Sequence, residues 1–432
     1  MKIAYFSPVS PQKTGIADYS EVELLPYLPH HLDIDIFIDT KIRPNNDDLK
    51  KKFNIYPYTD YEKMKESYDI PLYHVGNNEC HDYIYRSLIK NPGITIFHDI
   101  YLHNFLWSVS IGQGSTDRYR EEFKYCYGEE GLNIADRAIG TGAYPEFDYP
   151  LIKRILDHSL GVICHNDFSI QVALKEKPDA SITKIHHPLT IPQEIKDLES
   201  QNARKIKENL SIEAKKPIIV SFGFISSHKR YHVLLRAFKK LLVEFPDAVL
   251  LLVGKDLMGI DNLITSLGLA GSVIKAGFVP FTDIVKFLAI ADFCVNLRHP
   301  TAGETSGSVL RIMAAKKSVI VSDVGWFSEI PEDCCLKVAV DSHEEDLLLA
   351  YMQTLAANAR MREAIGENAL RWVEREHNPQ RIAEEFYRYI KSVVDGDEIV
   401  MTRVSEALLH LGVDEQDDNL LRHVSASIRG IL

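Results

Sequence analysis

The stretch DFCVNLRHPTAGETSGSVLRIMAAKKSVIVSDV, residues 292–324, reads as a strand, a helix and a second strand in succession. Its first run, DFCVNLR, and its last, SVIVSDV, are short, apolar and typical of buried strands. The segment that begins at Gly307 carries apolar residues at helical spacing. A strand, a crossover helix and a further strand predict a parallel sheet covered by helices.

The same alternation extends upstream through the second half of the chain. Five strand-like runs alternate there with four helical segments, which predicts a doubly wound Rossmann-like domain. These runs are PIIVSFG, AVLLLVG, SVIKAGF, DFCVNLR and SVIVSDV. Helical residues from about Glu344 to Val394 are expected to close this domain.

The first half of the chain repeats the pattern with the runs KIAYFSP, DIDIFID, PLYHVG, ITIFHD and GVICHND, interspersed with the helical segments SEVELLPYL and HDYIYRSLIK. A polar, lysine-rich stretch then separates the two series. We therefore predict an N-terminal α/β domain at residues 1–190, a linker at 191–215 and a C-terminal α/β domain at 216–385. Residues 386–432 are expected to form a helical extension that ends in two short amphipathic helices.

Composition sets limits on function. At 432 residues the chain is long enough for two cores, and its net charge of -12 argues against a nucleic-acid partner. The longest apolar runs are too short to span a bilayer, and the N-terminal sequence lacks the pattern of a secretion signal. The six cysteines are scattered and are read as reduced thiols. A cytoplasmic protein is expected, while its oligomeric state is not indicated.

Chemistry is expected where loops leave the strands, because ligands of open parallel sheets bind beyond the carboxyl ends of the strands. One such loop carries Lys229 and Arg230 at a helix start, and another carries Gly303, Glu304, Thr305, Ser306, Gly307 and Ser308. Two cations beside a glycine- and hydroxyl-rich helix N-terminus suit a diphosphate. The alternatives are a solvated Lys-Arg pair and a simple helix cap formed by Thr305 or Ser306. The chain lacks both the G-x-G-x-x-G fingerprint and the P-loop pattern.

Four segments together resemble the large family of retaining glycosyltransferases with the two-domain GT-B fold, group 1. They are TGIADY, FGFISSHKRYHVLLRAF, LLLVG and GETSGSVLRIMAAKKSVIVSDVGWFSEI, and the resemblance covers residues 1–390. It implies two Rossmann-like doubly wound domains that face a central cleft, with a short helical appendage. In this family the C-terminal domain binds a nucleotide-diphosphate sugar, the N-terminal domain binds the acceptor, and neither a metal nor a further cofactor is required.

The resemblance also implies roles for single residues. Lys229 looks like the lysine that grips the donor diphosphate, and Gly15 looks like the glycine whose backbone lies against phosphate and sugar. His98 is similar to the histidine that faces the donor sugar. Glu304 resembles the first acid of the E-x7-E signature, which holds the hydroxyls of that sugar. The donor-binding set then also includes Gly223, Gly303 and the residues from Thr305 to Ser308.

Two positions depart from the family pattern. Phe224 stands where an arginine commonly follows Gly223, which leaves Arg230 as the candidate for the second phosphate-binding charge. The second acid of the signature falls at Arg311, with a spacing that is one residue short. Arg311 is interpreted as a contact for the ribose, for a phosphate or for Glu304, or equally as a member of a structural ion pair.

Further candidates lie on the acceptor side, namely Asp18, Asp99 and His103. Asp18 would touch a sugar or cap the following helix, and a structural histidine is the default for His103. Asp33 and Asp35 spell the D-x-D of metal-dependent transferases, but they lie inside a strand-like run. The lysines at residues 50–52 would face anionic lipid or, more simply, water.

The resemblance thus implies a metal-independent retaining glycosyltransferase, and we expect it in the cytoplasm or at the inner face of the membrane. Lys229, Glu304 and His98 would act on the donor, a UDP-sugar rather than a GDP-sugar, and the acceptor would be a glycan or lipid-linked hydroxyl in cell-surface polysaccharide synthesis. The alternatives are an epimerase or phosphorylase of the same fold and a non-catalytic nucleotide-sugar-binding scaffold.

Overall fold

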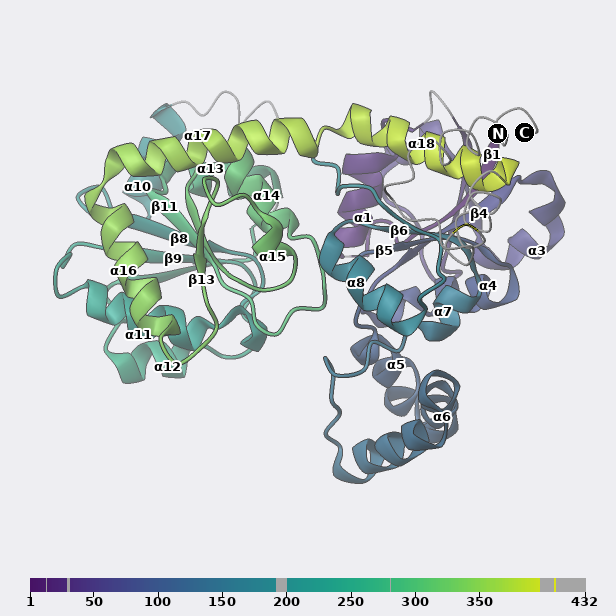
Figure 1. Cartoon of the computed structure of the whole chain (residues 1–432). Helices are drawn as coiled ribbons and strands as arrows, with labels where there is room; N and C mark the ends of the chain where they lie inside the picture. Colours follow the sequence, from purple (N-terminus) through teal and green to yellow (C-terminus); the bar gives the residue numbers. More distant parts are fainter. Residues whose placement is uncertain (13, 29–31, 192–199, 280, 397–407, 409–432) are drawn as a thin grey trace.

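The computed structural model describes residues 1–12, 14–28, 32–191, 200–279, 281–396 and 408. Two domains lie side by side, and each consists of a parallel sheet with helices on both faces (Figure 1). Both predicted doubly wound domains are therefore confirmed. The segment predicted to form two C-terminal amphipathic helices lies outside the described residues, apart from Leu408.

The described N-terminal sheet has seven parallel strands in the order β3-β2-β1-β4-β5-β6-β7. They are β1 (Lys2–Phe6), β2 (Asp33–Ile38), β3 (Asn54–Pro57), β4 (Ile70–Val75), β5 (Gly93–Phe97), β6 (Ser159–Cys164) and β7 (Ile182–Lys184). The five predicted runs correspond to β1, β2, β4, β5 and β6. The strands β3 and β7 escape prediction because they are short and only partly buried.

The helices of this domain cover the sheet and extend it on one side, where α5 and α6 project away from the rest of the molecule (Figure 1). They are α1 (Gly15–Asp18), the π-helix η1 (Tyr19–Leu24), α2 (Asp47–Lys52), α3 (Tyr61–Met64), α4 (Asp82–Lys90), α5 (His103–Val109), α6 (Thr116–Thr141), α7 (Lys153–Asp157) and α8 (Asp167–Glu176).

The described C-terminal sheet has six parallel strands in the order β10-β9-β8-β11-β12-β13. They are β8 (Ile218–Phe222), β9 (Val249–Val253), β10 (Val273–Gly277), β11 (Phe293–Asn296), β12 (Val319–Ser322) and β13 (Leu336–Val338). Its helices are α10 (Ser200–Asn209), α11 (Tyr231–Leu241), α12 (Asp261–Leu267), α13 (Phe281–Ile290), α14 (Gly307–Ala314), α15 (Trp326–Glu329), α16 (Glu344–Ala357) and α17 (Ala359–Glu376). All five predicted strands and the four intervening helices are present.

The strand order of each sheet reverses at one point. In the N-terminal domain the chain proceeds to opposite sides from β1 and β4, and in the C-terminal domain from β8 and β11. Loops that leave such neighbouring strands diverge and leave a crevice at the carboxyl edge of the sheet. These two crevices are where the fold places a ligand.

The last described helix, α18 (Pro379–Asp395), corrects an expectation. We expected the helices up to about Val394 to close the C-terminal domain, but α18 lies across the N-terminal domain (Figure 1). Its buried face includes Ile382, Phe386 and Ile390, which pack in one core with residues of β1 and β2. The hydroxyl of Tyr389 accepts a hydrogen bond from the Val162 amide of β6 at 3.0 Å. The chain therefore returns to its first domain because the amphipathic helix covers an apolar face there.

Candidate active site

Lys229 lies buried in the crevice between β8 and β11, at the end of the 3-10 helix η6 (Ser227–Lys229). Its Nζ donates a hydrogen bond to the carbonyl oxygen of Phe222 at 3.0 Å. Gly223 has a φ of 113°, and a Cβ at this position would lie 2.2 Å from Lys229 Nζ and 3.5 Å from Ser308 Oγ. Glycine is therefore required here both for its backbone conformation and for the close approach of the ammonium group.

The neighbouring loop, after β11, places a second cation in the same crevice. Arg298 Nε lies 2.9 Å from Glu304 Oε1, and the side chains of both residues are largely buried. Glu304 Oε2 accepts hydrogen bonds from Thr301 Oγ1 at 2.8 Å and from the Ala302 amide at 3.0 Å. Our sequence analysis did not single out Arg298, although it stands two residues beyond β11, where a side chain at this crevice would be expected.

These charges act on one another. Burial, reinforced by the nearby Arg298 guanidinium and opposed by Glu304, lowers the pKa of Lys229 to about 7. A lysine this close to neutrality holds its proton weakly, so an anion placed beside it would raise the pKa again. The crevice is consequently suited to a negatively charged ligand.

The predicted donor-binding hydroxyls at the start of α14 lie in different surroundings. Ser306 is the N-cap of α14, since its Oγ accepts a hydrogen bond from the Val309 amide at 3.3 Å. Thr305 Oγ1 accepts one from Asn166 Nδ2 of the N-terminal domain at 3.1 Å. Of the predicted hydroxyls, Ser308 is the one that lies beside Gly223 and Lys229.

Gly303 and Gly307, which were predicted to bind the donor, also have contacts within the protein that leave little room for a side chain. Gly303 has a φ of 84°, and a Cβ there would lie 2.5 Å from Ile100 of the N-terminal domain. The carbonyl of Gly303 accepts hydrogen bonds from Asn166 Nδ2 and Ser169 Oγ, both at 2.9 Å. A Cβ at Gly307 would lie 2.6 Å from Arg311 NH1. The small size of these glycines therefore permits the domain contact and the position of Arg311.

Arg230 does not join Lys229. Its backbone is left-handed, with a φ of 50°, and its guanidinium forms a two-pronged ion pair with Glu344 at the start of α16. The buried Glu344 carboxylate requires this partner. The prediction that Arg230 supplies the second phosphate-binding charge is thus at odds with the structure, in which Glu344 occupies its guanidinium.

Arg311 connects the two domains. Its NH2 group lies 2.7 Å from Oε1 of Glu23, a fully buried residue of η1. The second oxygen of Glu23 accepts a hydrogen bond from the Thr190 amide. Glu304, one of the alternative partners for Arg311, forms its ion pair with Arg298. The structural ion pair is present instead, between domains.

Gly15, His98 and Asp99 are the predicted donor- and sugar-facing residues of the N-terminal domain. Gly15 begins α1, and the space next to its Cα is open. His98 Nε2 lies 2.9 Å from Nδ1 of His74, and its ring packs edge-on against Tyr19. Burial, followed by the neighbouring His74, lowers the pKa of His98 well below its usual range, so this ring is neutral.

Asp99 and Glu304 approach each other from the two domains. The amides of Ile100 and Tyr101 both donate to the carbonyl of Ala302, at 2.7 and 3.2 Å, which joins the loops that carry the two carboxylates. Burial, and then the charge of Glu304, raise the pKa of Asp99 to about 7. Asp99 Oδ2 accepts a hydrogen bond from the Asn77 amide at 2.8 Å. Asp99 is therefore part of the same site as Lys229 and Glu304.

The remaining acceptor-side candidates, His103 and Asp18, differ in burial. His103 is fully buried in α5, where its ring nitrogens contact the Pro145 carbonyl and the Tyr119 hydroxyl. It is a core residue, so its assignment to the acceptor side is wrong. Asp18 is exposed at the end of α1 and caps no helix with its side chain. Although the residue is exposed as a whole, neighbouring protein atoms partly desolvate its carboxylate and raise the pKa of Asp18, and the charge of Arg311 opposes this shift.

The domain interface also contains a helix cap. Glu329 of α15 accepts hydrogen bonds from the amides of Asp167 and Phe168, at 3.0 and 2.8 Å, at the start of α8. Asn166 caps the same helix through its Oδ1, which accepts from the Ser169 amide at 2.8 Å. Figure 1 shows α8 and α15 next to each other where the domains meet. The C-terminal domain thus completes a helix of the N-terminal domain.

The other motifs have structural explanations. Asp35 is buried and is bound by Lys2, Asn54 and Tyr68, as expected for a strand residue. The described residues contain no group of three or more His, Cys, Asp or Glu side chains arranged for a metal ion. Lys50 and Lys51 pair with the acids one turn earlier in α2, Asp47 and Asp48.

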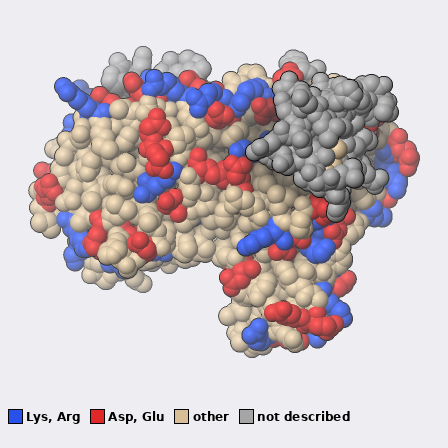
Figure 2. All heavy atoms as spheres, in the orientation of Figure 1, with Lys and Arg blue, Asp and Glu red and all other residues tan. Residues whose placement is uncertain are grey.

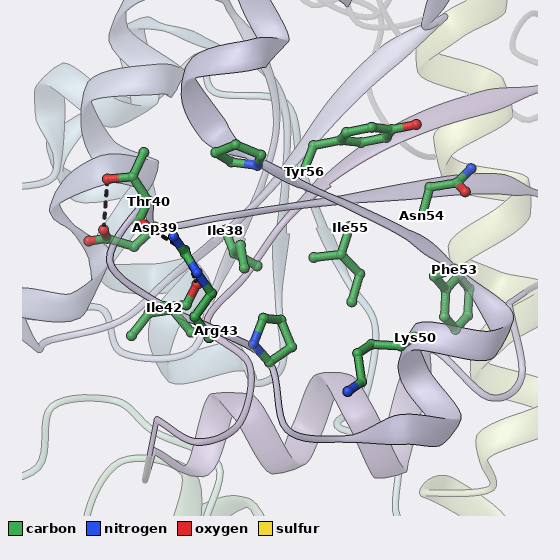
Figure 3. A pocket seen from close by; sticks show the side chains of 12 residues that line it. Ile38, Asp39, Thr40, Ile42, Arg43, Lys50, Phe53, Asn54, Ile55 and Tyr56 are labelled. Carbon is green, nitrogen blue, oxygen red and sulfur yellow. Dashed lines mark hydrogen bonds between the residues drawn. The ribbon is translucent and has the colours of Figure 1, made fainter.

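A separate cavity of about 470 Å³ lies at the outer edge of the N-terminal sheet, beyond the ends of β2 and β3 (Figure 3). Ile38, Ile42 and Ile55 form an apolar lining, and Arg43 and Lys50 stand at its sides. The Arg43 guanidinium donates to two carbonyls of its own loop. None of the candidate site residues lines this cavity.

Figure 2 shows the charged side chains on one face of the molecule. On the described part of the face in Figure 2, positive and negative side chains are interspersed, including along α17 and α18. Every helix among the described residues is either too short or too polar to span a bilayer.

Comparison with known proteins agrees with this architecture. Residues 202–372 match the family model of the group 1 glycosyl transferases. Spore coat protein SA of Bacillus subtilis is 26% identical over 200 residues, 43% of this chain and 52% of that protein. The match to this curated relative therefore spans about half of its length.

Two solved structures resemble the whole fold. Anabaena HepE, in complex with UDP-glucose, has a TM-score of 0.61 at 16% identity, over 91% of this chain and 100% of that one. Sucrose-phosphate synthase of Thermosynechococcus elongatus has a TM-score of 0.62 at 17% identity, over 92% and 100% of the two chains. The molecule therefore has the GT-B fold. Within this fold, residues 202–372 are similar to the group 1 glycosyl transferases.

Proposed function

We propose that this protein is a retaining glycosyltransferase that moves a sugar from a nucleoside-diphosphate sugar to an acceptor hydroxyl. The observation that carries the proposal is the buried Lys229, which lies beside Gly223 and Ser308 at the switch point of the C-terminal sheet. The loop that follows Asp99 in the N-terminal domain is hydrogen-bonded to the loop that carries Glu304, which supports a site shared by the two domains. A UDP-sugar is the donor we favour, because structural neighbours were solved with UDP and UDP-glucose.

The proposed chemistry needs stabilisation of a departing diphosphate. The bond between the anomeric carbon and the β-phosphate oxygen breaks, and the acceptor oxygen bonds to the same face of the sugar. The acceptor proton passes to the departing phosphate oxygen. Lys229 and the N-terminus of α14 would stabilise the growing negative charge, and such preorganised groups are each worth about 10²–10³ in rate. Metal would not be required for this step.

Glu304 and the N-terminal domain would hold the sugars. The Glu304 carboxylate, fixed by Thr301 and Ala302, would accept hydrogen bonds from the donor-sugar hydroxyls. Gly15, His98 and Asp99 would border the transferred sugar from the other domain. The acceptor, a glycan or lipid-linked hydroxyl of a surface polysaccharide, would enter from this side, in the cytoplasm or at the inner face of the membrane.

The function is tested by measuring nucleoside diphosphate release from a panel of UDP-, GDP- and ADP-sugars, with glycan and lipid-linked acceptors. We expect release to depend on the acceptor, to persist in EDTA and to fall sharply in Lys229→Ala. NMR of the product should show the anomeric configuration of the donor. Conversion of a nucleotide sugar into its epimer without transfer to an acceptor would instead indicate an epimerase. Phosphate-dependent release of a sugar phosphate from a glycan would indicate a phosphorylase.

A second candidate is a non-catalytic nucleotide-sugar-binding protein. The Arg311–Glu23 pair favours it, since an ion pair occupies the place where the family signature has its second acid. Tight binding of a nucleotide sugar with no turnover for any acceptor would support this candidate.

A further inference from the structure

The loops that carry Lys229 and Arg298 are hydrogen-bonded to each other between β8 and β11, at the point where the strand order of the sheet reverses. Lys229 Nζ and Asn296 Nδ2 both donate to the Phe222 carbonyl, each at 3.0 Å. Just beyond, the His299 amide donates to the His228 carbonyl at 2.8 Å. Lys229 directly follows His228, and Arg298 directly precedes His299. Both side chains therefore belong to the same crevice.

The Arg298 side chain is short of hydrogen-bond acceptors. It is only 12% exposed, and its buried Nε makes no hydrogen bond within the described chain. The distance between Arg298 Nε and Glu304 is that of an ion pair, but the two groups do not form a hydrogen bond. A guanidinium has five N–H donors, and a buried donor such as this Nε is costly to leave without an acceptor. The arrangement therefore has unused capacity for an anion with several oxygens.

Arg230 shows the opposite arrangement. Its Nε and NH2 groups each donate to one oxygen of the Glu344 carboxylate. The two parallel N–H donors of this guanidinium are therefore already used and cannot bind a phosphate as well. Arg230 is next to Lys229 in the sequence, and Arg298 lies near Lys229 in the fold. Of these two arginines, Arg298 is thus the one whose N–H donors are available to a ligand.

We propose that Arg298 is the second cation that binds the donor diphosphate, in the place the sequence had suggested for Arg230. The assignment rests on the proposed function and deepens it. Glu304 keeps its contacts with Thr301 and Ala302, so Arg298 can turn its terminal nitrogens to phosphate oxygens while Glu304 stays in position for the sugar. A planar fork that matches phosphate geometry would then complement the point charge of Lys229. The influence of Arg298 on the pKa of Lys229 agrees with this proximity.

The test is calorimetric titration of UDP and of uridine against wild type, Arg298→Gln and Arg298→Lys. Losing hydrogen bonds to a charged group should weaken UDP binding about 10- to 100-fold in Arg298→Gln, with a smaller loss in Arg298→Lys. Uridine binding should be unchanged, because the nucleoside lacks the diphosphate. The matched control is the double variant Arg230→Met with Glu344→Met, which removes a complete ion pair and should bind UDP as wild type does.

The outcomes separate this assignment from the proposed function. Wild-type affinity for UDP in both Arg298 variants, with binding lost in Lys229→Ala, would overturn the role of Arg298 alone. Loss of UDP binding in the Arg230 and Glu344 double variant, with an intact thermal melt, would return the role to Arg230. Failure of the wild-type protein to bind UDP, GDP or ADP would overturn the proposed function and this assignment together.

Discussion

Lys229 is a cation held where water solvates it poorly. It is buried against the backbone of Gly223, in the same crevice as the positive Arg298, and its pKa is about 7 instead of the usual value near 10.5. A protein keeps such a group at a cost, because burying charge disfavours the protonated form. A bound anion removes that cost, which is why we interpret the residue as a ligand contact.

This view predicts a pH dependence. An anionic ligand favours protonated Lys229, so binding takes up a proton when the free protein is above its pKa of about 7. The affinity for UDP should therefore fall as pH rises from 7 to 9, by up to about tenfold per unit. Lys229→Arg stays charged throughout this range and should show a flat profile. A wild-type profile as flat as that of Lys229→Arg would contradict the account.

Glu304 offers a second prediction at this scale. In Glu304→Gln the counter-charge of Arg298 is lost, while the side chain keeps its size and one acceptor oxygen. UDP should then bind at least as tightly as to wild type, because Arg298 no longer has a competing carboxylate. Transfer of the sugar should fall about 10- to 100-fold, since a hydrogen bond to a charged group is lost. Titration with UDP and turnover of UDP-glucose measure the two effects, and equal weakening of both would exclude a role in holding the sugar.

At the scale of elements, the buried strands could be predicted because their apolar runs are nearly continuous. The strands β3, β7 and β13 could not, since they are three or four residues long and partly exposed. Lys229 and Glu304 could be placed at a site because both follow predicted strands. The partners Arg298–Glu304, Arg311–Glu23 and Asn166–Gly303 depend on how loops and domains meet, which hydrophobic periodicity does not encode.

The cap that Glu329 places on α8 is such a contact, and it can be tested. Glu329→Ala removes the acceptor of two N-terminal amides, and losing a cap costs about 1 kcal/mol. Hydrogen exchange at the Asp167 and Phe168 amides should become about fivefold faster, in line with that free energy. Glu332→Ala, which removes an exposed acid nearby, is the control and should leave both amides unaffected. Unchanged exchange in Glu329→Ala would show that the cap contributes nothing in solution.

On the scale of the whole molecule, the chain joins its domains twice. It passes from the first domain to the second before β8 and returns through α18, whose apolar side chains complete the core around β1 and β2. Sequence periodicity identified the helix at this position but not the domain on which it packs, because an amphipathic face fits either sheet. The return of the chain fastens the C-terminal domain to the N-terminal one outside the site.

Removal of one large side chain from α18 should therefore destabilise the N-terminal domain. Phe386 is fully buried in this core, and Phe386→Ala should cost about 3–5 kcal/mol. Hydrogen exchange of the β1 amides, followed in increasing urea, reports on that domain separately. The exposed Arg388 on the same helix provides the control, and Arg388→Ala should change stability by less than about 0.5 kcal/mol. Equal behaviour of the two variants would contradict this role of α18.

The central claim is that a nucleoside-diphosphate sugar binds with its diphosphate at Lys229, in the crevice between β8 and β11. The most direct measurement is the affinity of wild type and Lys229→Ala for UDP-glucose, by calorimetric titration at pH 6.5, where Lys229 is largely protonated. The account predicts that the wild-type protein binds and that Lys229→Ala binds about 10- to 100-fold more weakly, with an unchanged thermal melt. Equal affinity of the two proteins would contradict it, because the diphosphate would then lie elsewhere.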